Sequence, residues 1–247
     1  VGLEILDQLP DVDVVLVPVG GGGLISGVAY AIKHLRPECK VYGVQSAGAP
    51  SMKESMEQHQ MLTLDSVSTF ADGIAVKHPG DLTYELVNQY VDGIVTVTDD
   101  ETAAAVLALI ERQKLIAEGA GAVAVAAAMY NKVDIKGKKT VCLLSGGNID
   151  VNILSRVIAR GLIMAGRSST LTIALEDKPG QLQGVSEVIS RCGGNVVSVH
   201  YSQADTNMRI TSCYLHIGME TRDHAQVEQI KQELAKAGFN IVQTVNG

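Results

Sequence analysis

The first two thirds of the chain alternate short apolar runs with amphipathic stretches. Four runs rich in Val, Ile and Leu, at residues 14–19, 41–45, 93–97 and 140–144, are typical of strands buried on both faces. The stretch after the first run has helical spacing and ends at Pro37. Its expected buried face consists of Leu24, Val28, Ala31, Ile32 and Leu35. Thr98 with Glu101 predicts a capping box. This order predicts an α/β fold, a parallel sheet with helices on both faces.

The pattern changes near residues 165–168, and the remainder reads strand, helix, strand, strand, helix, strand. The expected strands are 171–175, 195–202, 211–219 and 240–245, and the expected helices are 180–192 and 223–237. Gly193, Gly194 and Gly238 follow the helices, as C-terminal caps do. This order predicts a ferredoxin-like βαββαβ unit. We place the boundary near Arg167, which gives domains at residues 1–166 and 167–247.

Composition narrows the class of partner. The 247 residues are 46% hydrophobic and 19% charged, which is typical of a globular protein, and no apolar run reaches the roughly 18 residues of a membrane span. A net charge of −7, 4% aromatic residues and no basic run argue against nucleic-acid binding. We therefore expect a soluble, cytoplasmic protein with a small-molecule partner, no membrane and no nucleic acid.

The four cysteines are widely separated in the sequence. They are Cys39, Cys142, Cys192 and Cys213. No pair has the CxxC spacing of zinc or redox sites, so we expect buried, reduced thiols.

The most informative segment is the glycine loop, Gly20 to Gly23, which stands between a predicted buried strand and a helix. Successive backbone N–H groups without side chains between them can converge on an anion at the helix N-terminus, and phosphate is the natural occupant. The segment fits neither a Walker loop nor GxGxxG, because Val28-Ala29 and Ile25-Ser26 stand at the required positions. The alternative is a tight turn that needs glycine only for its backbone geometry.

Four motifs in a fixed order carry a resemblance to a known family. They are Val17-Pro18-Val19 with Gly20 to Gly23, Ala71-Asp72-Gly73-Ile74-Ala75-Val76, Glu118-Gly119-Ala120-Gly121-Ala122, and Leu144-Ser145-Gly146-Gly147-Asn148. Together they resemble the threonine dehydratase branch of the fold type II pyridoxal-phosphate enzymes. The resemblance implies pyridoxal 5′-phosphate as the cofactor, a parallel-sheet fold type II domain that is only partly present, and conversion of L-threonine or L-serine to a 2-oxo acid and ammonia.

The resemblance also implies residue roles. The backbone of Gly20, Gly21, Gly22 and Gly23 binds the 5′-phosphate, and a side chain at Gly22 is expected to block that cradle. Ser145 hydrogen-bonds the pyridine nitrogen. A neutral hydroxyl does not hold that nitrogen protonated, which favours β-elimination over transamination. The alternative for Ser145 is a turn serine that satisfies the following Gly-Gly bend.

In the family, the Schiff-base lysine lies well N-terminal to the glycine loop, and none of the twelve lysines here has that context. The chain begins at Val1 inside a helical pattern without a leader, so we interpret it as a C-terminal fragment that is inactive alone. Two other hypotheses stay open: a serine racemase or other lyase of the same family, and a non-catalytic amino-acid-binding module.

Gln45, Ser51 and Glu118 bear on whether the chain holds a metal ion or a further catalytic group. Related enzymes bind a divalent cation through carboxylates where this sequence has Gln45 and Ser51, so we expect no metal site. Glu118 matches an acidic family position near the cofactor, but an isolated Glu at a helix start is equally a favourable N-terminal charge, and we do not assign it as catalytic.

The C-terminal segment resembles ACT regulatory domains. Its D-x-P-G-x-L match contains Asp177, Gly180, Gln181 and Leu182, and Gly194-Asn195-Val196 matches the entry to the second strand. Pro179 and Gly180 expose the first N–H groups of a helix to an amino acid's carboxylate, and Asn195 offers a donor and an acceptor. The alternative is a capped helix start. The resemblance implies an allosteric enzyme of isoleucine biosynthesis or threonine degradation, inhibited by a branched-chain amino acid and assembled as a dimer or tetramer.

Overall fold

The computed structural model describes residues 1–203 and 211–245. By its internal contacts the chain divides into two compact units, Val1–Ile158 and Ala159–Gly247. Each unit is described by itself. The boundary near Arg167 stays a prediction, although β5, the first strand of the second unit, begins one residue later.

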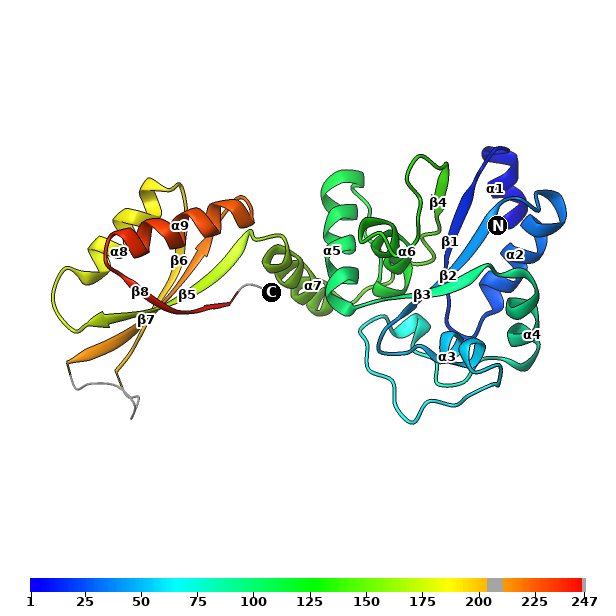
Figure 1. Ribbon diagram of the computed structural model, residues 1–247, viewed down its shortest axis with the longest axis horizontal. Coiled ribbons are helices and arrows are strands. Elements are labelled where there is room, and N and C mark those ends of the chain that lie inside the picture. Colours follow the sequence, from blue (N-terminus) through cyan, green and yellow to red (C-terminus); the bar gives the residue numbers. More distant parts are fainter. Residues whose placement is uncertain (204–210, 246–247) are drawn as a thin grey trace. The chain divides into compact units, whose positions relative to one another are not determined.

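The first unit is built on a parallel sheet with the order β3-β2-β1-β4 (Figure 1). Its strands are β1 Val14–Pro18, β2 Lys40–Ser46, β3 Gly93–Val97 and β4 Thr140–Cys142. Every residue of β1 is buried. Val14 and Leu16 belong to one apolar core and Val15 and Val17 to the other, so both faces of the sheet are covered, as the sequence predicts.

The helices of this unit lie on both faces of the sheet. They are α1 Gly2–Gln8, α2 Gly23–Leu35, α3 Ser51–Glu57, α4 Asp81–Tyr90, α5 Asp99–Ala108 and α6 Gly119–Met129, with a 3-10 turn at Asp72–Ile74 and a π-helical turn at Leu109–Gln113. The division between the two units falls within α7, Val151–Met164. Residues of α1, α2 and α4 form the core on one face, and residues of α5 and α6 form the core on the other. The predicted capping box between Thr98 and Glu101 is present at the start of α5.

One predicted helix face is partly wrong. Val28 and Ile32 are buried, but Leu24 is 38% and Leu35 is 63% exposed. The residues that α2 buries include Ile25 and Ala29, so the contact face is rotated by about one position from the expected stripe.

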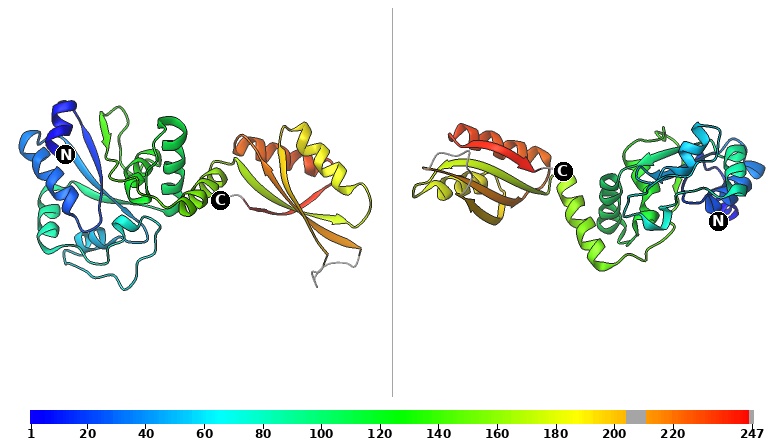
Figure 2. Two further views of the ribbon diagram at one scale, coloured as in Figure 1. Left: turned by 180° about the vertical axis from the view of Figure 1, so that it is seen from behind. Right: turned by 90° about the horizontal axis from the view of Figure 1, so that it is seen from below.

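The second unit has the predicted ferredoxin-like order (Figures 1 and 2). Its elements are β5 Ser168–Glu176, α8 Gln181–Arg191, β6 Asn195–Ser202, β7 Ser212–Glu220, α9 His224–Lys236 and β8 Asn240–Val245. The antiparallel sheet has the order β6-β7-β5-β8, and α8 and α9 cover one face of it. The end of the predicted strand at Val245 is confirmed, and residues 204–210 between β6 and β7 lie outside the described part.

The caps of this unit follow the sequence in part. Gly193 and Gly238 adopt left-handed angles, with φ of +78° and +87°. Gly194 does not; a Cβ there would lie 2.8 Å from a methyl carbon of Ile189, so close packing explains that glycine.

All four cysteines are free thiols. Cys39 and Cys213 are buried, whereas Cys142 and Cys192 are half-buried, so the expectation of burial holds for two of them. Burial raises the pKa of Cys142 to about 11, which keeps this thiol protonated at neutral pH. Within residues 1–203 and 211–245, no helix has the length and apolarity needed to cross a membrane.

Candidate functional site

One hollow of about 300 Å³ brings together all five residues predicted to bind the cofactor. Gly20, Gly21, Gly22, Gly23 and Ser145 line it. The residues come from two loops that are more than a hundred positions apart and that follow neighbouring parallel strands, β1 and β4. Because the carboxyl ends of parallel strands meet at one edge of the sheet, the hollow lies where α/β proteins commonly bind ligands.

The glycine loop has the features of an anion cradle. Among the hydrogen bonds of the described residues, none is donated by the backbone N–H of Gly20, Gly21 or Gly22. An added Cβ at Gly21 or Gly23 would meet nothing within 4 Å, so open space lies beside the loop. Free N–H groups, open space and the start of α2 together suit a phosphate group.

The expected reason for glycine at position 22 is wrong. A Cβ on Gly22 would lie 2.6 Å from the methyl carbon of Met52 and 2.9 Å from Thr83, which is packed protein and not the hollow. Gly22 also has a φ of +94°, a conformation that favours glycine. Position 22 therefore needs glycine for backbone geometry and packing, and Gly21 borders the open space.

Ser145 reaches the hollow from a loop and not from a strand. The strand predicted at 140–144 is shorter in the structure and ends at Cys142. Beyond it, the Leu143 N–H still donates to the carbonyl of Leu16 in β1 at 3.0 Å. The side chains of β4 are half-buried, since this strand forms the edge of the sheet. Ser145 itself is exposed at the hollow, where its hydroxyl is accessible to a ligand.

Among the described residues that line the hollow of the glycine loop, Glu118 has the charged side chain. It lines the hollow of the glycine loop and a second hollow of about 230 Å³, which also contains Asp72, Asn148 and Asp150. Its backbone N–H donates to the carbonyl of Gly146 at 3.1 Å, and its Oε2 accepts from the backbone N–H of Asn148 at 3.1 Å. Glu118 therefore holds the segment that carries Ser145.

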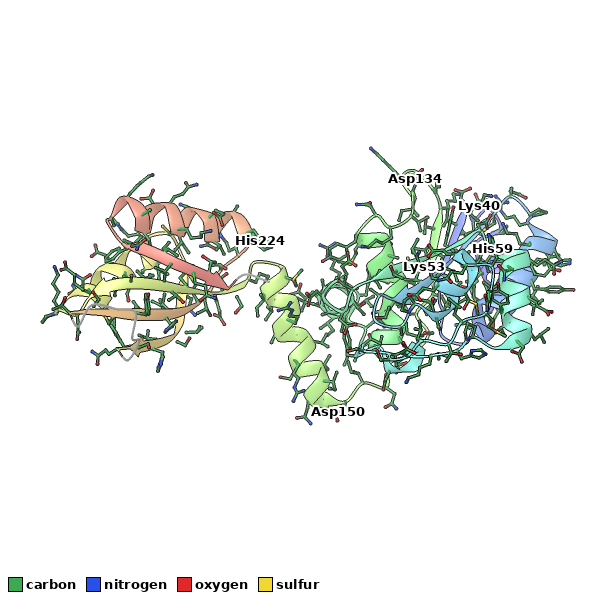
Figure 3. All side chains as sticks on the ribbon, turned by 60° about the horizontal axis from the view of Figure 1, so that its bottom comes forward. Lys40, Lys53, His59, Asp134, Asp150 and His224 are labelled. Atoms are coloured by element: carbon green, nitrogen blue, oxygen red, sulfur yellow. The ribbon has the colours of Figure 1, made fainter. Side chains whose placement is uncertain are left out.

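Asp150 fixes the other end of that segment. Its Oδ1 accepts from the backbone N–H groups of Asn152 at 2.8 Å and Ile153 at 3.3 Å, which caps the start of α7 (Figure 3). Residues 145–150 are thus held on both sides by carboxylates.

The two positions at which related enzymes are expected to carry metal-binding carboxylates are buried here. Gln45 is fully buried, and its Oε1 accepts from the backbone N–H of Lys53 at 2.9 Å. Ser51, also fully buried, begins α3. The described residues contain no group of three or more His, Cys, Asp or Glu side chains suited to a metal ion. The absence of a metal stays a prediction.

The predicted effector residues lie at opposite ends of the second unit. Asp177, Gly180, Gln181 and Leu182 follow the end of β5 at Glu176, whereas Asn195 begins β6 and pairs with Glu220 at the other end of the sheet. Gly180 has a φ of +90° and open space around it. The Asn195 side chain donates to Glu220 at 2.9 Å. One chain does not bring the two parts together.

Comparison with known proteins identifies the family. The model of the family described as "Pyridoxal-phosphate dependent enzyme" matches residues 1–146. The chain belongs to this family, whose cofactor is pyridoxal 5′-phosphate. The sequence motifs around the hollow, which prompted the same assignment, all lie within or directly beside the matched residues.

The chain is similar to an L-threonine ammonia-lyase, a threonine deaminase and a serine racemase. An L-threonine ammonia-lyase of Thermotoga maritima is 47% identical over 241 residues, which cover 98% of this chain and 60% of that protein. Threonine deaminase isoform 2 of Solanum lycopersicum has a similar structure, with a TM-score of 0.61 and 38% identity over 64% of this chain and 44% of that one. The structure of maize serine racemase is also similar, with a TM-score of 0.58 and 33% identity, and the match covers 64% of this chain and 51% of that one. The chain thus spans about 60% of the length of the curated relative.

Some residues that line the hollow or support its loops could not be predicted from the sequence. Gly73 and Ile74 line the hollow, but their motif did not indicate this position. Thr83 and Ser26, which hold the glycine loop from outside, carry no sequence signal, because their partners are backbone carbonyls.

Proposed function

We propose that this chain is part of an L-threonine ammonia-lyase, which converts L-threonine to 2-oxobutanoate and ammonia, and that it contains the residues that bind the phosphate of the cofactor. The observation that carries the proposal is the hollow in which the free N–H groups of the glycine loop and the Ser145 hydroxyl meet. The similarity to the Thermotoga maritima enzyme along 98% of this chain supports this substrate over serine racemisation.

In this proposal the residues have separate tasks. The N–H groups of Gly20 to Gly23 hold the 5′-phosphate, and the Ser145 hydroxyl hydrogen-bonds the pyridine nitrogen. When bound, pyridoxal phosphate supplies the electron sink for loss of the α-proton and the β-hydroxyl. Ser145 is neutral and does not stabilise a protonated ring, which disfavours the transamination side reaction. Glu118 and Asp150 keep the Ser145 segment in place.

The lysine that anchors the cofactor is expected from the part of the relatives that this chain does not match. No lysine lines the hollow among the described residues. A chimera tests this directly: the unmatched part of the Thermotoga maritima protein is joined to this chain, and 2-oxobutanoate release from L-threonine is measured. We expect turnover in the chimera and none in this chain alone. A chimera that binds cofactor but racemises L-serine without deaminating L-threonine would contradict the proposed substrate.

The second unit is proposed to be an ACT-type amino-acid receptor in a cytoplasmic homo-oligomer. Its ferredoxin-like topology and the exposed start of α8 at Gly180 support this. Since Gly180 and Asn195 lie at opposite ends of one unit, a single effector can contact both only if two copies meet. Sedimentation of the chain with and without isoleucine tests the assembly, and a monomer under both conditions would contradict it.

A further inference from the structure

The carbonyl groups of the glycine loop are held by side chains that do not line the hollow. The backbone N–H of Gly80 donates to the Gly21 carbonyl at 3.2 Å. The Thr83 hydroxyl lies 2.5 Å from the same oxygen, which is the shorter of its two contacts, and 2.9 Å from the Gly80 carbonyl. Gly80 caps α4 and Thr83 belongs to its first turn. The Gly21 carbonyl is therefore held from the side of α4.

The next carbonyl is held as well. Gly22 accepts from both the backbone N–H of Ser26 at 3.0 Å and its hydroxyl at 2.8 Å. Ser26 is 3% exposed, so water does not replace these bonds. Two successive peptide carbonyls of the loop are thus fixed by protein donors.

The orientation of the N–H groups follows from peptide geometry. The described residues contain no cis peptide bond, and in a trans peptide the C=O and the N–H point in opposite directions. Fixing the Gly21 carbonyl toward α4 directs the Gly22 N–H away from α4. The Gly22 carbonyl is held toward Ser26 of α2, so the Gly23 N–H points away from Ser26. Both groups border the hollow.

Four glycines in a row would otherwise be the most mobile kind of backbone, because glycine has the widest choice of φ and ψ. A loop that must be ordered by its ligand binds that ligand more weakly than a loop ordered in advance. Thr83 also packs directly beneath Gly22, where an added Cβ would lie 2.9 Å from it.

We propose that Thr83 is a positioning residue for the anion cradle: its hydroxyl holds the Gly21 carbonyl and so orders the N–H group of Gly22 toward the ligand's phosphate. The inference rests on the proposed function, because it assigns the cradle to a phosphate. It adds a residue from α4 that does not line the hollow.

The test compares Thr83→Ala with Thr83→Ser in this chain. The alanine loses the hydroxyl and the serine keeps it. Asn88→Ala is the matched control, because Asn88 on the same helix donates only to the Tyr84 carbonyl at 2.9 Å and is exposed. The probes are pyridoxal 5′-phosphate and inorganic phosphate, titrated by calorimetry. The 15N relaxation of the Gly22 and Gly23 amides is recorded without ligand.

We expect Thr83→Ala to lower the binding affinity for both probes about five- to tenfold, which corresponds to the loss of one hydrogen bond. Thr83→Ser should bind both probes with the affinity of the unmodified chain. Asn88→Ala should also keep that affinity, even if its melting temperature changes. The Gly22 amide becomes more mobile only in Thr83→Ala, and the Gly23 amide changes less, because Ser26 still holds the carbonyl of its peptide. Unchanged affinity in Thr83→Ala, or a serine variant as weak as the alanine, overturns the inference. If the unmodified chain binds neither probe, the assignment of the glycine loop as a phosphate site is wrong. The role of Thr83 is tested separately by relaxation, and unchanged relaxation of the glycine amides in Thr83→Ala overturns that role.

Discussion

The backbone N–H of Asn148 donates a hydrogen bond of 3.1 Å to Oε2 of Glu118, thirty positions earlier in the chain. This contact and the bond from the Glu118 N–H to Gly146 join the start of α6 to the segment after β4. Ser145 lies next to that junction. The position of its hydroxyl therefore depends on a carboxylate that belongs to a different loop.

Replacing Glu118 with Ala should weaken binding of pyridoxal phosphate several-fold, because the segment 145–148 loses its side-chain acceptor. Glu118→Gln keeps an oxygen in the same place and should retain most of the affinity. Titration of cofactor fluorescence measures both variants. Equal affinity in Glu118→Ala and the unmodified chain would show that the carboxylate does not position Ser145.

The two middle glycines should respond differently to the same substitution. Gly21→Val places a side chain in open space, so phosphate binding should be lost with little change in the melting temperature. Gly22→Val forces a branched residue to a φ of +94° against Met52 and Thr83, and should destabilise the first unit by about 1–3 kcal/mol. Thermal unfolding and phosphate titration on both variants check this. A Gly21→Val variant that binds phosphate normally would contradict the open-space assignment.

Asp92 gives a prediction about pH. Burial alone would raise the pKa of Asp92, but hydrogen bonds from Lys33, the Val41 N–H and Lys40 outweigh it and hold the pKa below its ordinary value of 3.8. The Lys33 and Lys40 ammonium groups lie 2.6 and 2.9 Å from this carboxylate, and Lys40 is visible on the first unit in Figure 3.

A group with a lowered pKa contributes stability that is present above the ordinary value and is lost as the pH falls through the lowered value. Asp92→Asn should therefore destabilise the first unit at pH 7, by about 1.5–3 kcal/mol, the range for hydrogen bonds to a charged group. The difference from the unmodified chain should stay constant down to about pH 4 and narrow below it. Urea unfolding across this range measures it, and a difference that widened in acid would have the wrong sign.

Much of the fold could be predicted because its signals are local. The apolar runs at β1 and β2 predict buried parallel strands, and Thr98 with Glu101 predicts the start of α5. The run at β3 forms the predicted strand, but it is mostly half-buried. The helix face of α2 could not be placed as well, because Leu24 and Ile25 are both apolar and only the neighbouring elements decide which of them is buried.

The candidate site was predictable where a motif carries its chemistry. Gly20 to Gly23 and Ser145 do meet at one hollow. The support from Thr83 was not predictable, because a hydroxyl that donates to a carbonyl 62 residues away leaves no pattern in the sequence. The role of Gly22 was misjudged for the same reason: Met52 packs against it from α3, and only the folded chain shows this contact.

We expect the thermal stability of the second unit to depend on an amino-acid ligand. If the start of α8 receives an amino acid's carboxylate, isoleucine or valine should raise the melting temperature with the logarithm of its concentration above the dissociation constant. Calorimetry with isoleucine, valine, threonine and serine identifies the effector. Asn195→Ala should weaken binding by about 1–3 kcal/mol through one unpaired polar group. No binding of any of the four at millimolar concentration would refute the receptor proposal.

The most direct test of the account is whether this chain holds the phosphate of pyridoxal phosphate at the glycine loop. The 31P resonance of the cofactor, titrated with the chain, should shift in a saturable way, and Gly21→Val should abolish the shift while the protein stays folded. A shift of the same size and midpoint in Gly21→Val, or no saturable shift with the unmodified chain, would contradict the assignment of the cradle to Gly20 to Gly23.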